Sequence, residues 1–246
     1  MKKRDIKLSE TYILKEYYIQ YLKKIRGNSL TTIKHYLSAL DVISSYLVKK
    51  QQIKTSLYEI VDLSDLQIVK ENLCQDIIFV EKDERGHRMY TAALNNYYRF
   101  ASGETFFSIQ DKLLVMDIAI PKSDKRLQLV ESVNRSSIIK NQVIMSSGYM
   151  CEINNEHKTF IADSTKQPYM EGHHSIPMNK QDSFNNSLDV YANIISLCPI
   201  CHRLLHYGIC EEKTEILKKI YYLRADRLYN SGLKISQSDF INFSLQ

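Results

Sequence analysis

The chain has 246 residues, of which 44% are hydrophobic and 25% charged, and its formal net charge is +5. These values are ordinary for a globular protein with one large core or two smaller ones, and the few glycines and prolines leave little room for long disordered linkers. No apolar run approaches the ~18 residues of a membrane helix, and no apolar stretch follows the basic start, so we expect a cytoplasmic protein without a signal peptide or membrane contact.

Residues 1–104 are expected to form a helical domain that binds or recognises DNA. The first 26 residues carry eight basic and three acidic side chains, which suits contact with phosphates, although a solvated helix face explains this charge equally well. Apolar residues recur at helical spacing, and cap residues mark several helix ends. The predicted helices are Tyr12–Ile25, Leu30–Leu47 after an N-cap at Ser29, a helix capped by Ser64, and Met89–Phe100, ended by Gly103.

Residues 105–134 are predicted to be a connector, in which Leu113–Ile120 fits either a strand or a buried helical turn. Residues 135–246 are predicted to form a second domain of mixed composition. It begins with a helix at Ser136–Met145 and ends in helical sequence, where Glu211–Tyr229 is a candidate dimer or interdomain surface. Four short β-like segments lie between them: Tyr149–Ile153, Thr159–Ala162, Tyr169–Met170 and Ser175–Met178.

Five of the seven histidines and three of the five cysteines lie between Cys151 and His206. In a chain without export signals, this clustering indicates metal binding rather than disulfides. A Cys-x2-Cys pair brings two thiolates to one ion, and three cysteines with one histidine make a closed tetrahedral zinc shell. The sequence therefore predicts a structural Zn²⁺ held by Cys151, His157, Cys198 and Cys201.

A second group of histidines has the spacing of a catalytic metal site. His202 and His206 are four residues apart, so on a helix both can face one ion. The adjacent pair His173 and His174 would point to opposite sides of a strand, so that one ligates the metal while its neighbour faces a water. Histidine suits the role of general base because its ordinary pKa is about 6.5.

The order of these segments resembles the HNH, or ββα-metal, endonucleases, and more narrowly the McrA-like restriction enzymes. The resemblance covers roughly residues 149–208 and rests on YMEGHHSIPM from Tyr169, DVYAN ending at Asn193, and LCPICHRLLH ending at His206. It implies an α+β fold, in which an N-terminal helical domain precedes a zinc-stabilised ββα-metal nuclease domain with a C-terminal helix. Position 154 departs from the pattern, because Asn154 stands where many relatives have a further cysteine.

The resemblance also implies a role for each matching residue. His173, His202 and His206 would hold the catalytic ion, His174 would be the general base, and Asn193 would hydrogen-bond the loop that bears the base. Mg²⁺ is the ion expected from the family, although imidazoles also accept Mn²⁺ and other divalent ions.

The function expected from the resemblance is hydrolysis of phosphodiester bonds in double-stranded DNA, by a Type II or modification-dependent restriction enzyme. A palindromic target would favour a homodimer. Arg203, beside the metal helix, is a candidate phosphate contact, although a solvated arginine explains it equally well. Two alternatives remain open, namely a zinc-stabilised DNA-binding module without catalysis and an HNH nicking or homing nuclease.

Overall fold

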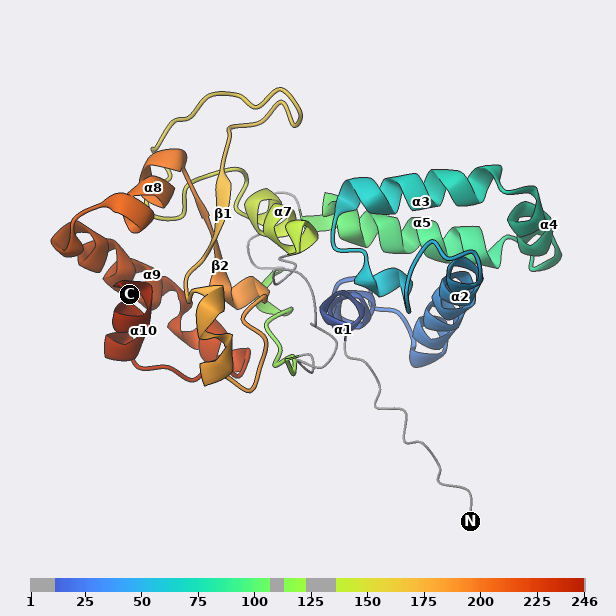
Figure 1. Ribbon diagram of the computed structural model, residues 1–246, viewed down its shortest axis with the longest axis horizontal. Helices are drawn as coiled ribbons and strands as arrows, with labels where there is room; N and C mark the ends of the chain where they lie inside the picture. Colours follow the sequence, from blue (N-terminus) through green and yellow to red (C-terminus); the bar gives the residue numbers. More distant parts are fainter. Residues whose placement is uncertain (1–11, 107–112, 123–135, 246) are drawn as a thin grey trace, which may run out of the picture.

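A computed structural model describes residues 12–106, 113–122 and 136–245 (Figure 1). Helices make up the N-terminal part, and a small sheet with further helices makes up the C-terminal part. The N-terminal helices are α1 (Ile13–Gln20), which continues into a π-helical turn η1 (Tyr21–Ile25), α2 (Leu30–Lys49), α3 (Leu63–Gln75), α4 (Ile77–Arg85) and α5 (Met89–Ser102). The later elements are α7 (Ser137–Ser146), β1 (Glu171–His174), β2 (Ile194–Leu197), α8 (Pro199–Tyr207), α9 (Cys210–Asn230) and α10 (Gln237–Leu245).

The ends of the N-terminal helices follow from local capping. The Ser29 hydroxyl accepts a hydrogen bond from the backbone N–H of Thr32, 3.1 Å away, and so begins α2. Gly103 ends α5 with a φ of 78°, a conformation that glycine adopts without steric cost. The predicted cap at Ser64 is wrong: α3 begins two residues earlier, where the Asp62 carboxylate accepts the backbone N–H of Ser64 at 2.9 Å.

Aromatic residues join the N-terminal helices to the C-terminal part. The rings of Tyr17 and Tyr191 lie 4.1 Å apart, and the backbone N–H of Tyr191 donates to the Tyr17 hydroxyl over 3.0 Å. The Tyr191 hydroxyl in turn donates to Gln142 of α7. Because these side chains are buried, one apolar core runs through the described residues of both parts. The division into domains at residues 104 and 134 stays a prediction.

Part of the predicted connector is described, and it packs against α9. The backbone N–H of Met116 donates to the carbonyl of Leu113, so this segment opens with a helical turn. The Asp117 carboxylate then accepts two hydrogen bonds from the Arg227 guanidinium, at 2.6 and 2.9 Å, and its side chain is 2% exposed. Residues 107–112 and 123–134 of the predicted connector lie outside the described residues.

The sheet has two antiparallel strands, in which His173 pairs with Ile195 and His174 with Ile194. Strand β1 therefore lies between the predicted segments Tyr169–Met170 and Ser175–Met178. Strand β2 was not predicted, because all four of its residues are buried and it shows no alternation of polar and apolar positions.

None of the four predicted β segments is itself a strand in the described residues. Tyr149–Ile153 runs beside β2 and donates the N–H of Glu152 to the carbonyl of Ser196. Thr159–Ala162 forms a single bridge, between Ile161 and Pro168. Segments this short, with so few backbone pairs, show little alternation of polar and apolar residues, so the sequence does not distinguish them from strands.

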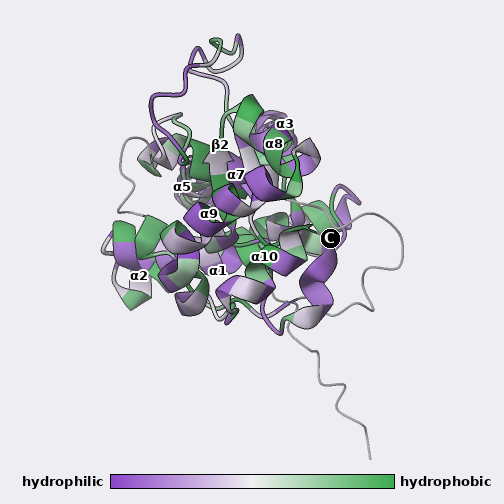
Figure 2. Cartoon of the chain, turned by 90° about the vertical axis from the view of Figure 1, so that its left-hand side faces the viewer, coloured by the Kyte–Doolittle hydropathy of each residue, from purple (hydrophilic) through white to green (hydrophobic). Residues whose placement is uncertain are grey.

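The C-terminal helices surround the sheet and bury one face each. In Figure 2, hydrophobic and hydrophilic segments alternate along the helical ribbons, as expected for helices with one buried face. Helix α9 buries Leu217, Ile220, Arg224 and Leu228, while Tyr222 is 86% exposed. Among the described residues, no helix has the length and apolar character needed to cross a membrane.

Candidate active site

Three cysteines and one histidine meet at the start of α8. The thiols of Cys151, Cys198 and Cys201 and a ring nitrogen of His157 all lie within 4.8 Å of one another. Nδ1 of His157 lies 3.5 Å from the Cys198 sulfur and 3.4 Å from the Cys201 sulfur. The donor set and its spacing fit a tetrahedral Zn²⁺ ion.

Local structure holds these thiols in place. The Cys198 sulfur caps α8 by accepting the backbone N–H of Cys201, and Pro199 occupies the first helical position, where no N–H is needed. Cys151 lies beside β2, since the flanking residues Met150 and Glu152 both hydrogen-bond to Ser196.

The contact between the Cys151 and Cys201 thiols changes the acidity of both. A hydrogen bond from Cys201 lowers the pKa of the Cys151 thiol, which favours its thiolate form. The same contact raises the pKa of Cys201. A divalent ion would relieve the repulsion between neighbouring thiolates, because it binds the deprotonated form of each.

The other cluster consists of three imidazoles on two elements. His173 lies on β1, whereas His202 and His206 lie one helical turn apart on α8. Their ring centroids are 4.8 to 5.1 Å apart, and one nitrogen from each ring lies within 4.8 Å of the others. Burial, with the neighbouring positive groups adding to it, lowers the pKa of His173 to about 3, so this imidazole is neutral and able to ligate an ion.

Glu171 supports this cluster from the same strand. Its carboxylate is in close contact with Nδ1 of His202, which leaves Nε2 as the nitrogen for an ion. By residue type alone, Glu171 could be either a supporting acid or an ordinary strand residue. The signal was its position two residues before His173, which places both side chains on one face of β1.

His174 forms a buried pair with a carboxylate that the sequence analysis did not select. Nε2 of His174 lies 2.9 Å from the nearer oxygen of Asp189, and the two side chains are 6% and 7% exposed. The other Asp189 oxygen accepts the backbone N–H of Ser136, 3.0 Å away. No spacing rule identifies Asp189, because it reaches His174 from a loop fifteen residues later in the chain.

Asn193 joins the two loops next to this pair through side-chain hydrogen bonds. Its carbonyl oxygen accepts the N–H of Ile176 at 2.7 Å, and its amide donates to the carbonyls of Ile176 and Leu188, both at 2.9 Å. Asn193 thus contacts the loop after β1 and the residue before Asp189. It holds His174 and Asp189 together through the backbone.

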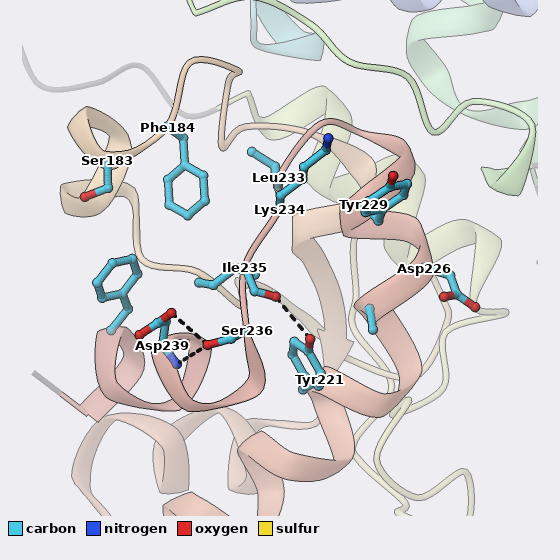
Figure 3. Close-up of a pocket in the computed structure, with 12 residues that line it drawn as sticks. Ser183, Phe184, Tyr221, Asp226, Tyr229, Leu233, Lys234, Ile235, Ser236 and Asp239 are labelled. Carbon is cyan, nitrogen blue, oxygen red and sulfur yellow. Dashed lines mark hydrogen bonds between the residues drawn. The ribbon is translucent and has the colours of Figure 1, made fainter.

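Arg203 lies on the exposed side of α8, and its guanidinium is 5.8 Å from the centre of the Tyr207 ring. A hollow of about 630 Å³ lies elsewhere, at the turn between α9 and α10 (Figure 3). There the Tyr221 hydroxyl donates to the carbonyl of Ile235, and Ser236 hydrogen-bonds to Asp239. None of the predicted site residues lines this hollow.

Comparison with known proteins agrees with this geometry. Residues 150–208 match the model of the HNH endonuclease family. The chain is 27% identical over 114 residues to the Type IV methyl-directed restriction enzyme EcoKMcrA of Escherichia coli (strain K12), a match that covers 45% of this chain and 38% of that enzyme. The chain thus spans well under two thirds of this relative. The resemblance to the HNH endonucleases and the α+β fold class are confirmed.

Proposed function

We propose that this chain is a divalent-metal-dependent endonuclease that hydrolyses phosphodiester bonds in double-stranded DNA. One observation carries the proposal: three imidazoles converge within 4.8 Å beside a buried histidine–carboxylate pair, inside the stretch that matches the HNH family. The first group suits an ion and the second suits proton transfer. The two are adjacent because His173 and His174 are consecutive on β1.

His173, His202 and His206 would hold the catalytic ion, which is Mg²⁺ or Mn²⁺ in this proposal. When bound, the ion supplies positive charge that offsets the charge developing on the scissile phosphate and the leaving 3′ oxygen. Glu171 keeps His202 oriented for ligation by its contact with Nδ1.

His174 would take a proton from the attacking water. Its Nε2 faces Asp189, so the hydrogen of the neutral ring lies on Nε2, and Nδ1 carries the lone pair that accepts the proton. The Asp189 carboxylate holds this tautomer and stabilises the imidazolium that forms, as the aspartate does in a serine protease triad. Asn193 holds the two loops in place during this proton transfer.

The biological setting in this proposal is a restriction system, supported by the likeness to EcoKMcrA. Residues 1–104 would recognise DNA, Zn²⁺ at the cysteine cluster would stiffen the nuclease region, and a homodimer would place one active site on each strand. A DNA-binding module without catalysis is disfavoured, because it would have no use for the buried His174–Asp189 pair. A nicking or homing nuclease would share the same site and differ in its products.

Digestion of plasmid DNA tests the proposal. Methylated and unmethylated plasmids are incubated with Mg²⁺ or Mn²⁺ and either the wild-type protein or His174→Ala. We expect discrete fragments from the wild type and a rate lower by about 10²- to 10⁴-fold for the variant, the usual contribution of a general base. His35→Ala, an exposed histidine on α2, is the matched control. Equal cutting by wild type and His174→Ala would remove His174 from this role.

A further inference from the structure

The three imidazoles lie between two hollows that share a rim. One hollow of about 540 Å³ extends toward α9 and α10, and the other, of about 510 Å³, extends along α7 and the outer side of α8. Lys140, Gly172, His202 and His206 line both of them. The two hollows therefore form one groove that passes across the proposed metal ligands.

Lys140 reaches the shared rim because β1 has a glycine at that point. A Cβ atom at Gly172 would lie 3.1 and 3.2 Å from the Cβ and Cγ atoms of Lys140, closer than ordinary contacts. The lysine stem therefore lies directly against the strand, one residue before His173. In Figure 1, α7 lies between the N-terminal helices and β1, which is the position that brings Lys140 here.

The groove is lined by positive groups. In the hollow toward α9, the described lining residues include Lys140 and Lys213 but no aspartate or glutamate. The ammonium group of Lys213 donates to the backbone carbonyl of His206 over 3.1 Å, which places it next to the metal helix. In the other hollow, the one lining carboxylate is Glu171, which is already in contact with His202.

We propose that Lys140 and Lys213 bind the phosphates on the two sides of the cleaved bond, so that one DNA strand lies along this groove. The inference rests on the proposed endonuclease function and extends it to how the strand is held. Two ammonium groups that line the groove beside the ligand cluster suit an anionic chain, since each neutralises one phosphate and releases a bound counterion. The lysines come from α7 and α9, so both elements would contact the same strand.

The test measures binding without cleavage. The His174→Ala protein with Mg²⁺ is titrated with a fluorescein-labelled duplex of random sequence at several salt concentrations, alone and combined with Lys140→Gln or Lys213→Gln. We expect each change to weaken binding by about 10-fold at low salt and to reduce the salt slope by about one. Lys219→Gln removes the same charge from an exposed position on α9 and is the matched control. Lys140→Arg keeps the charge and should restore both values.

The outcomes separate the two proposals. If the wild type cuts DNA but both lysine variants bind like Lys219→Gln, the groove assignment is wrong and the endonuclease proposal stands. A second outcome is that the wild type cuts no DNA while Lys140→Gln and Lys213→Gln still reduce the salt dependence of duplex binding. In that case the endonuclease proposal fails, and the groove binds nucleic acid for another purpose. Should Lys140→Gln not fold, Lys213→Gln and Lys140→Arg still decide the result. Absence of duplex binding would overturn both proposals.

Discussion

The cysteine cluster and the histidine cluster both use residues of α8, but they differ in how far they are exposed. Helix α8 and its N-cap residue supply two candidate ligands to each cluster: Cys198 and Cys201 to the cysteine cluster, and His202 and His206 to the histidine cluster. Cys151, Cys198 and Cys201 are only 1 to 4% exposed, whereas His206 is exposed and borders two hollows. A closed set of thiolates suits a structural ion, and an open set of imidazoles suits an ion that must meet a substrate.

Because α8 begins inside the cysteine cluster, the two clusters should depend on each other in one direction. Loss of the cysteine ligands should release the helix that carries His202 and His206. Loss of the histidine ligands should leave the helix in place. The following experiments test this asymmetry, from the largest expected effect to the smallest.

Replacement of one of the proposed cysteine ligands should abolish the fold of the C-terminal part. Zn²⁺ binding contributes on the order of 10 kcal/mol to small zinc domains, more than the whole stability of many domains. We expect Cys198→Ser to lose its zinc, its cooperative thermal transition and all cleavage, as measured by elemental analysis, calorimetry and plasmid digestion. Cys210→Ser, an exposed cysteine at the start of α9, should change none of these. One zinc per chain and an unchanged melting curve in Cys198→Ser would contradict the structural role.

Replacement of Asp189, which pairs with the proposed base His174, should remove activity and leave the fold intact. In Asp189→Asn, the amide can keep its bond to the Ser136 N–H only by turning its NH₂ group toward His174, which favours the wrong tautomer. We expect the single-turnover rate to fall by about 10²- to 10⁴-fold, with little change in KM. The ¹⁵N shifts of the His174 ring should show the altered tautomer. Asp226→Asn, on the exposed side of α9, is the control, and a rate within a few-fold of wild type would count against the Asp189 pair.

Replacement of Glu171, which contacts the proposed ligand His202, should weaken binding of the catalytic ion and leave zinc binding unchanged. Glu171→Gln removes the negative charge that orients His202, and such changes typically cost about 10- to 100-fold in metal affinity. Cleavage measured across a range of Mn²⁺ concentrations should shift to higher concentrations by that factor. The zinc content should stay at one per chain. An unchanged Mn²⁺ dependence would show that Glu171 does not support the ligand.

Replacement of His157, the imidazole of the cysteine cluster, by a cysteine should have the smallest effect. His157 lies on the more accessible side of this cluster, and four cysteines bind Zn²⁺ as readily as three with a histidine. We expect His157→Cys to keep one zinc per chain, its melting temperature within a few degrees and its activity. His157→Ala should lower the zinc affinity in a chelator competition. If His157→Ala holds zinc as tightly as the wild type, His157 is not a ligand.

The parts of the site that the sequence anticipated are those set by neighbouring positions. Cys198 and Cys201 have the Cys-x2-Cys spacing of a zinc site, and His202 and His206 have the spacing of one helix face. Consecutive residues of a strand, such as His173 and His174, point to its opposite sides. Such relations depend on local backbone geometry, which the residue order carries directly. The cap at Ser29 and the end of α5 at Gly103 were predictable for the same reason.

The rest depended on chain segments that meet only after folding. Strand β2 carries no alternation because both its faces are buried. Asp189 lies in a loop, and it reaches His174 only because Asn193 ties that loop to the end of β1.

The sequence alone therefore indicated the types of candidate ligand and the helix that presents His202 and His206, since both follow from a few neighbouring residues. Only the tertiary structure decided which carboxylate faces His174 and which lysine lies over Gly172. Those contacts join elements far apart in the chain, and their positions follow from how the whole core packs rather than from any local periodicity.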